Sequence, residues 1–313
     1  MPGAPRFCPA STLASRLASG QFVVTTELTP PVSSDPAQLL ARARALKGHA
    51  TAVNVTDGAG AKVHMSSMAA CSILLRDGIE PIMQMTCRDR NRIALQGDLL
   101  GALALGIRNV LVLGGDDPKF GDQPVAKPVF DYDSRALLAV ANRIRSEREL
   151  PTGAEVGGEV DLFLGAVDVP VDPPPGWNPG ALFAKAEAGA DFIQTQFCMD
   201  LGVVRRYAAR LLDLGLAQRL PVIIGICPIP SVRSALWMRQ KLFGSIIPDE
   251  VVERLEKASD PRLEGKRICI ELLRELAQIP GISGAHIMAP QNPSVVPEVI
   301  AESGVSDKAH ALA

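Results

Sequence analysis

The segment FVVTTELTPP, residues 22–31, decides the fold predicted for this chain of 313 residues. It is a short apolar run rich in β-branched residues, which is typical of a buried strand, and Pro30 and Pro31 end it. A doubly wound open sheet predicts a GxGxxG glycine fingerprint directly after its first strand. No such fingerprint follows Leu28, which favours a closed barrel over the open sheet.

Seven further apolar runs follow, and stretches with helical spacing lie between them. The runs are Ala52–Asp57, Pro81–Cys87, Asn109–Gly115, Leu162–Val169, Phe192–Phe197, Pro221–Cys227 and Ala285–Ala289. Most of them begin about 30 residues apart, which corresponds to one β-α unit each. Near-continuous apolar runs indicate parallel strands buried on both faces, and eight of them predict a (β/α)8 TIM barrel.

Composition narrows the class of protein. The chain has 32 Lys and Arg against 34 Asp and Glu, so it lacks the basic excess of a nucleic-acid-binding protein. A hydrophobic fraction of 47% argues against a disordered chain. We expect one barrel domain over residues 1–313, with residues 1–20 as an N-terminal extension or helix. A homo-oligomer is compatible with the sequence, which specifies no oligomeric state.

Targeting signals and cysteine usage point to the cytoplasm. The longest nearly uncharged stretch, Leu99–Ile107, is far shorter than the roughly 20 residues that a membrane-spanning helix needs. The first 20 residues contain no apolar core of signal-peptide length. Six cysteines are scattered without a CxxC pair, which predicts reduced, mostly buried thiols and no zinc site.

In a barrel of this type the chemistry lies where the strands end. Glu27 stands inside the first apolar run, where a carboxylate is costly unless it is paired or protonated. One interpretation is a side chain that points to solvent or forms an ion pair at the rim. The other is a general acid with a raised pKa.

Other strand ends carry weaker signals. The stretch from Asp57 to Lys62 is not a Walker loop, and its glycines fit an ordinary tight turn. The charges of Arg88, Asp89 and Arg90 are interpreted as solvated. Gly114 and Gly115 precede Asp116, and this pattern fits either a turn or close approach to a flat ligand whose nitrogen the acid addresses.

Gln194 and Gln196 are two residues apart on the sixth run, so both are expected to face the same way. An inward glutamine needs a partner, and a ligand that offers a donor and an acceptor would supply it. The four histidines have no metal-ligand spacing, and no GxSxG elbow is present, so neither a metal site nor a hydrolase is predicted.

Several segments, read together, form a recognisable series: TELTPP (Thr26–Pro31), VNVTDGAG (Val53–Gly60), MTCRDRNR (Met85–Arg92), LGIRNVLVLGGDDP (Leu105–Pro118), FDYD (Phe130–Asp133), KAEAGADFIQTQFCMD (Lys185–Asp200) and GICPIPS (Gly225–Ser231). In this order, and over roughly residues 22–292, they resemble the methylenetetrahydrofolate reductase family. The resemblance implies a barrel that binds FAD and an oxidoreductase of one-carbon metabolism. Its reaction would interconvert 5,10-methylenetetrahydrofolate and 5-methyltetrahydrofolate, with hydride from NAD(P)H.

The resemblance also implies roles for individual residues. Glu27 matches the acid that assists opening of the folate ring, and Asp116 matches an aspartate near the flavin N1 edge that also faces the pterin. Gln196 resembles a glutamine that hydrogen-bonds the pterin. Flavin contacts are implied for a further set of positions, namely Thr56, Gln84, Tyr132 and Lys185.

The chain departs from the family pattern where FAD and substrate are held. The stretch after the fifth run, GAVDVPVDPPPGWNP, lacks the usual Tyr and His, and Gly114 replaces an arginine. Gln84 stands in place of a histidine, and Ser234 and Met238 replace a glutamine and a phenylalanine. Two alternatives therefore stay open: direct hydride transfer from NAD(P)H without flavin, and a non-catalytic folate-binding subunit of a methyl-transfer complex.

Overall fold

The computed structural model describes residues 11–289 and 292–305, and its strands form one closed parallel barrel. Each strand pairs with the next along the chain, and the eighth pairs with the first. This confirms the predicted (β/α)8 barrel. The strands are β1 (Val23–Leu28), β2 (Ala52–Val55), β3 (Pro81–Thr86), β4 (Asn109–Leu113), β5 (Phe163–Asp168), β6 (Phe192–Phe197), β7 (Val222–Ile226) and β8 (Gly284–Ile287).

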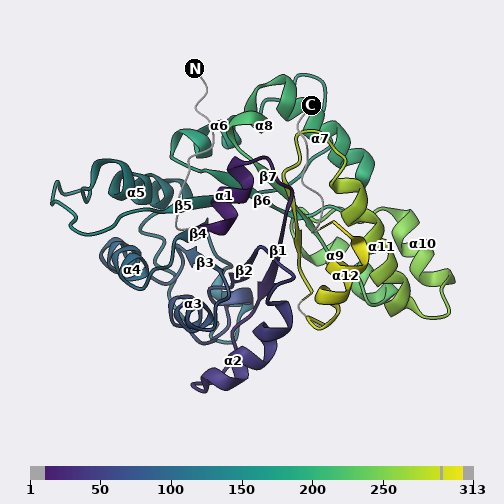
Figure 1. Cartoon of the computed structure of the whole chain (residues 1–313), viewed down its shortest axis with the longest axis horizontal. Helices are drawn as coiled ribbons and strands as arrows, with labels where there is room; N and C mark the ends of the chain where they lie inside the picture. The colour runs from purple at the N-terminus through teal and green to yellow at the C-terminus, as the bar shows by residue number, and fades with distance from the viewer. Residues whose placement is uncertain (1–10, 290–291, 306–313) are drawn as a thin grey trace.

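Helices surround the barrel, as Figure 1 shows. The α-helices after β1 are α2 (Pro36–Ala43), α3 (Ser67–Arg76), α4 (Arg92–Ala104), α5 (Ser134–Glu147), α6 (Gly180–Glu187), α7 (Leu201–Asp213), α8 (Leu216–Arg219), α9 (Val232–Lys241), α10 (Asp249–Lys257), α11 (Pro261–Leu276) and α12 (Val295–Ser303). Short 3-10 turns are η1 (Arg44–Leu46), η2 (Ala59–Ala61) and η3 (Pro118–Phe120). Between the strands and the helices lies the larger apolar core.

The end of the barrel where the strands begin is closed by α1 (Thr12–Ala18), which lies across the centre of Figure 1. Glu80 accepts hydrogen bonds from the backbone N–H groups of Thr12 and Leu13, at 2.8 and 2.9 Å. These are amides that the first turn of a helix leaves without partners. Residues of α1 pack on the inner apolar layer, whose members are Val23, Ala52, Ile82, Leu111, Phe163, Phe192 and Ile223. Among the described residues, α1 thus covers this end of the barrel, and the candidate site is sought at the opposite end.

A glycine makes room for the largest members of this layer. The rings of Phe163 and Phe192 stack with centroids 5.1 Å apart. A Cβ atom on Gly165 would lie 2.4 Å from Phe192 Cζ and 2.7 Å from a methyl of Leu111. Only glycine therefore fits here while the aromatic pair fills the barrel.

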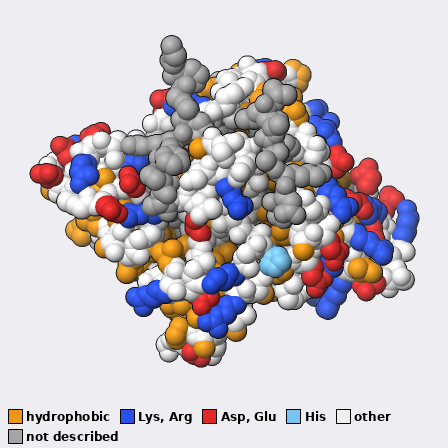
Figure 2. Space-filling view, in the orientation of Figure 1, with side chains coloured by type: hydrophobic (Ala, Val, Ile, Leu, Met, Phe, Trp, Pro, Cys, Tyr) orange, Lys and Arg blue, Asp and Glu red, His pale blue; other side chains and the backbone are white. Residues whose placement is uncertain are grey.

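On the face shown in Figure 2, charged side chains of both signs are interspersed, and they gather over α10 and α11. Arg254 pairs there with Glu264 and Glu271. No helix in the described ranges combines the length and the apolar character that a membrane crossing requires. Five cysteines are buried without disulfide bonds, while Cys8 lies outside the described residues.

Candidate active site

Side chains that face the inside of the barrel change from apolar to polar toward the ends of the strands. Alternation along β1 places Val23, Thr25 and Glu27 on the inner face at increasing height. Of these three residues, Glu27 lies nearest to the ends of the strands, and it is half-buried. The site is therefore built around a carboxyl group at the barrel mouth.

Glu27 faces Gln84 of β3, whose Nε2 donates a hydrogen bond of 3.4 Å to Glu27 Oε2. Burial raises the pKa of Glu27 above its ordinary value, and the bond from Gln84 opposes this with a smaller lowering. No ion pair involves Glu27 among the residues that the structure describes. Of the two interpretations left open by the sequence, the shielded acid fits this environment better than the rim ion pair.

A polar layer directly below Glu27 is satisfied within the protein. Thr25 Oγ1 and His286 Nδ1 are 2.9 Å apart, and Gln194 donates to Thr25 at 3.1 Å. Asn54 donates to Gln194 at 2.6 Å, and Gln194 donates back at 3.2 Å. Burial lowers the pKa of His286 to about 3, so its imidazole is neutral. The expectation that Gln194 awaits a ligand is wrong, because the barrel supplies its partners.

Sequence reasoning missed Thr25 and Asn54 as members of this layer. Thr25 precedes Glu27 by two residues, so the period of a strand places both on one face. Asn54 is the one amide in the apolar run Ala52–Val55, and a buried amide requires partners. Both signals were present in the sequence, but the partners are 140 and 169 residues away along the chain.

At the end of β2, Thr56 is only 3% exposed. Its Oγ1 is buried and has no hydrogen-bond partner among the described residues. A buried hydroxyl of this kind is costly unless something outside the chain satisfies it. Among the predicted flavin contacts, Thr56 thus has a hydroxyl group whose hydrogen-bonding capacity is unused within the described chain.

The charges after β3 are not solvated, which corrects the expectation for Arg88 and Arg90. Arg88 is 4% exposed, and its guanidinium pairs with Asp89 and donates to the carbonyl oxygens of Gly58 and Asp116. Arg90 forms an ion pair with Asp57, which also accepts from Thr86 at 2.8 and 2.9 Å. Barrel closure brings these loops together, so the arginines hold the loops of the mouth.

Asp116 lies exposed on the loop after β4, and it contacts the loop after β2. Its Oδ2 accepts a hydrogen bond from the backbone N–H of Gly60 at 3.0 Å. Gly60 has a φ of +63°, in the left-handed region that glycine tolerates. No hydrogen bond links Asp116 with Glu27 in the described part of the chain.

Lys185 extends from α6 to the end of β5. Its Nζ donates to the carbonyl oxygen of Val167 at 2.6 Å and is 3.4 Å from Asp168 Oδ1. Tyr207 donates to the other oxygen of Asp168 at 2.7 Å. The ammonium group of Lys185 is therefore held at the barrel mouth by the protein itself.

Tyr132, another predicted flavin contact, is held by two residues of α4. Its hydroxyl oxygen accepts from Gln96 of α4 at 3.3 Å, and the guanidinium of Arg92 lies over its ring at 5.1 Å from the centroid. Both partners belong to α4. None of the hydrogen bonds described for Tyr132 joins it to Glu27, Asp116 or Lys185.

Gln196 lies half-buried near the end of β6, where pairing with β7 shifts register between Gln194 and Phe197. Its Oε1 accepts from the backbone N–H of Phe197 at 3.0 Å, which leaves its Nε2 without a described partner. A Cβ on Gly225 would lie 2.5 Å from the carbonyl oxygen of Thr195, so a glycine allows this irregular pairing.

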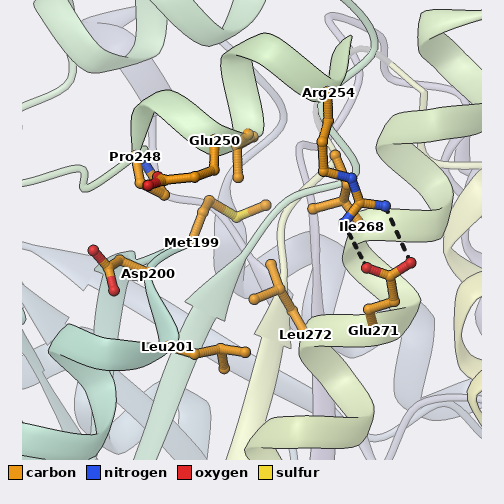
Figure 3. Close-up of a pocket in the computed structure, with 10 residues that line it drawn as sticks. Met199, Asp200, Leu201, Pro248, Glu250, Arg254, Ile268, Glu271 and Leu272 are labelled. Carbon is orange, nitrogen blue, oxygen red and sulfur yellow. Dashed lines mark hydrogen bonds and ion pairs between the residues drawn. The ribbon is translucent and has the colours of Figure 1, made fainter. Parts of the chain in front are cut away.

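A separate cavity of about 300 Å³ opens between the loop after β6 and helices α10 and α11 (Figure 3). Met199 and Leu272 line its apolar part, and the ion pair of Arg254 with Glu271 borders one side. None of the predicted site residues lines it. We therefore place the candidate active site at the barrel mouth.

Fold and site together define a (β/α)8 barrel with a shielded carboxylic acid at the end where its strands finish. The chain belongs to the methylenetetrahydrofolate reductase family, whose sequence profile matches residues 12–304.

Two curated relatives give the scale of the similarity. The "Probable methylenetetrahydrofolate reductase (NADPH)" of Caenorhabditis elegans is 28% identical over 252 residues, covering 78% of this chain and 35% of that protein. "Methylenetetrahydrofolate reductase 1" of Schizosaccharomyces pombe is 25% identical over 295 residues, covering 90% and 46%. The chain thus spans between a third and a half of the length of these relatives.

A solved structure shares the fold. An uncharacterized protein from Clostridium thermocellum, described as binding two copies of 5-methyl-5,6,7,8-tetrahydrofolic acid, superposes with a TM-score of 0.63. The match covers 95% of this chain and 99% of that one, at 15% sequence identity. This likeness concerns the fold alone.

Proposed function

We propose that this chain is an oxidoreductase that interconverts 5,10-methylenetetrahydrofolate and 5-methyltetrahydrofolate, with NAD(P)H as the source of hydride. The observation that carries the proposal is the half-buried carboxyl of Glu27, whose pKa burial raises, at the mouth of a barrel of this family. The names of the relatives support the reaction: that of the Caenorhabditis elegans protein includes NADPH, and that of a further relative, "Methylenetetrahydrofolate reductase (NADH) 1" of Arabidopsis thaliana, includes NADH.

Glu27 supplies the proton. In its protonated form it donates to N10 of the bound folate, the N10–methylene bond breaks, and an N5 iminium ion remains. Hydride addition to the methylene carbon then completes the methyl group, and in the reverse direction the carboxylate accepts the proton. A carboxyl group shielded from water is suited to this because it holds its proton closer to neutral pH.

Gln196 and Asp116 would position the pterin. The Nε2 of Gln196 is available as a donor, since in the described ranges the amide group is engaged through Oε1 alone. The carboxylate of Asp116 is fixed by the Gly60 amide, which would hold it toward a ring nitrogen.

The residues at the mouth are suited to hold the isoalloxazine ring of FAD. Thr56 offers a buried hydroxyl that has no partner among the described residues, and Gln84, Asp116, Tyr132 and Lys185 would hold the remainder of the group. FAD, when bound, carries hydride between NAD(P)H and the folate. Its site would share Gln84 with Glu27, so the flavin would affect the environment of the acid.

A second candidate is direct hydride transfer from NAD(P)H to the folate. Two observations favour it. The ammonium of Lys185 is already engaged with Val167 and Asp168, and Gly114 adds no cation for a diphosphate. In this flavin-independent reaction Glu27 would still donate the proton to N10, because ring opening needs that proton whether NAD(P)H or a flavin supplies the hydride.

Two properties complete the proposal. We assign residues 1–313 to a single barrel domain. We also assign the chain to the cytoplasm, where thiols stay reduced, because the five described cysteines are buried and unpaired.

A visible absorption spectrum with and without added FAD, combined with an assay of NAD(P)H oxidation by 5,10-methylenetetrahydrofolate, tests the function. Flavin-dependent activity supports the first candidate, and equal activity of rigorously flavin-free protein supports the second. Absence of activity under both conditions, with 5-methyltetrahydrofolate still bound, would instead indicate a non-catalytic folate-binding subunit.

A further inference from the structure

Arg88 lies between the loops that follow β2 and β4, and its side chain is only 4% exposed. Its Nη1 donates to the carbonyl oxygen of Gly58 at 3.2 Å, in the loop after β2. The same atom donates to the carbonyl oxygen of Asp116 at 3.4 Å, in the loop after β4. One guanidinium group just beyond β3 therefore joins the loops of the two strands that flank β3 in the barrel.

Asp89 fixes the orientation of this guanidinium group. Nε and Nη2 of Arg88 donate to the two carboxylate oxygens of Asp89, at 2.7 and 2.6 Å. A two-point pair of this kind sets the plane of the guanidinium group as well as its position. Hydrogen bonds to Asp89 raise the pKa of Arg88, so the group keeps its charge although it is buried. Nη1 is therefore left to face the two loop carbonyls.

Two glycines allow the loops to close on Arg88. A Cβ atom on Gly58 would lie 2.4 Å from Nη2 of the arginine, and one on Gly115 would lie 3.0 Å from its Cβ. Both glycines have positive φ, +61° and +98°, which a larger residue would adopt only with strain. The backbone of both loops is thus shaped around the arginine side chain.

Asp116 joins the same two loops a second time, through its side chain. Its Oδ2 accepts from the backbone N–H of Gly60 at 3.0 Å. This bond lies at an exposed residue, where water competes for both groups, whereas the guanidinium of Arg88 is buried. The buried contacts of Arg88 therefore hold the two loops at the separation that lets Gly60 reach the carboxylate of Asp116.

We propose that Arg88 is a positioning residue, which fixes Asp116 for its contact with the pterin. Arg88 acts through Asp116 and takes no part in proton or hydride transfer. The role of Asp116 toward folate rests on the proposed function, whereas the fixing of the two loops needs no ligand. A lysine at position 88 would keep the charge but would lack the planar fork that reaches Asp89 and both carbonyls together.

Hydrogen exchange in the unliganded chain tests the fixing of the loops. We expect Arg88→Lys to speed exchange of the Gly60 amide by roughly 3- to 10-fold, because its bond to Asp116 opens more often. Arg44→Lys is the matched control, since Arg44 forms a comparable two-point pair with Asp77 but is exposed and belongs to η1. Equal exchange of the Gly60 amide in Arg88→Lys and the unmodified chain would overturn the inference.

A double-mutant cycle on the Kd for 5-methyltetrahydrofolate tests the action through Asp116, without turnover or flavin. Arg88→Lys alone should raise the Kd by roughly 3- to 10-fold. In an Asp116→Ala background the same substitution should change the Kd by less than about 2-fold, because the group that it positions is absent. Equal effects in both backgrounds would show a general structural role and would overturn the inference.

Asp89→Asn provides a second variant if Arg88→Lys does not fold. It keeps Arg88 and weakens the pair that orients it, so the same two effects are expected at about 2- to 3-fold. Failure of the unmodified chain to bind 5-methyltetrahydrofolate would overturn the proposed function, and with it the contact with the pterin. An unchanged Kd and unchanged Gly60 exchange in Arg88→Lys, with folate still bound by the unmodified chain, would overturn this inference alone.

Discussion

Gln84 of β3 donates a hydrogen bond to Glu27 of β1, although β2 lies between these two strands. The bond therefore crosses the inside of the barrel mouth. The half-buried carboxyl group of Glu27 thus has one neutral hydrogen-bond donor. Among the described residues it has no cationic partner. Burial outweighs that donor, so the pKa of Glu27 stays raised. The pair supplies a carboxyl group with a raised pKa, and its environment can be altered through Gln84.

Replacing Glu27 by Gln should lower kcat by roughly 10²- to 10⁴-fold, because the amide keeps the shape but cannot donate a proton in the same way. Binding of 5-methyltetrahydrofolate should stay within a few-fold of the unmodified chain. Steady-state kinetics and calorimetric titration measure the two quantities. A variant that retains full kcat would remove Glu27 from the mechanism.

The activity should also depend on pH through Glu27. Its acid form is required for reduction, so the rate should fall as pH rises through the raised pKa. Gln84→Leu removes a hydrogen bond that stabilises the carboxylate, so the pKa should rise further and the alkaline limb should move to higher pH. The pH profile of kcat/KM for folate, at saturating FAD, measures this shift. A limb that moves to lower pH in Gln84→Leu would contradict the assignment.

Thr56→Val tests the flavin site. The substitution removes a hydroxyl that has no described partner, so the free energy of unfolding should be unchanged or higher. If the hydroxyl binds FAD, the Kd for FAD should rise by roughly 2- to 10-fold, the worth of one hydrogen bond. Flavin fluorescence titration gives the Kd, and denaturant unfolding gives the stability. An unchanged Kd for a flavin that does bind would exclude this contact.

Arg145 and Asp191 form a buried ion pair that joins α5 to the start of β6. Asp191 also accepts from the backbone N–H of Leu164 at 2.8 Å. Asp191→Ala should lower the free energy of unfolding by about 3–5 kcal/mol, because the arginine remains buried without its partner. Asp172→Ala breaks the exposed pair with Arg206 and should cost about 0–1 kcal/mol. Urea unfolding compares the two, and equal losses would contradict the role of burial.

Gly225→Ala should distort the mouth next to Gln196. The added Cβ would lie 2.5 and 2.8 Å from the carbonyl oxygens of Thr195 and Gln196. We expect a loss of about 1–3 kcal/mol in stability and a higher KM for folate. Gly97→Ala is the control, since a Cβ there meets nothing within 4 Å on α4, and it should stabilise by about 0.5–1 kcal/mol. Thermal unfolding and kinetics would show whether the two glycines differ.

The limits of the strands could be predicted closely from the sequence. The run Phe192–Phe197 coincides with β6, and Pro81–Cys87 exceeds β3 by one residue. Residues that could not be assigned correctly are those whose partners come from other loops. Arg88 reads as a solvated charge in its local sequence, yet the loops after β2 and β4 bury it.

By itself the sequence determined the alternation of strands and helices, the barrel and the place of Glu27 near the end of the first strand. These depend on the periodicity of neighbouring residues, which is present in any short window of the chain. Tertiary structure alone decided that Gln84 donates to Glu27, that Gln194 is satisfied by Thr25 and Asn54, and that Arg88 joins the loops after β2 and β4. Closure of the barrel sets these contacts because it joins groups far apart in the chain and removes water from around them, and this removal of water raises the pKa of the acid.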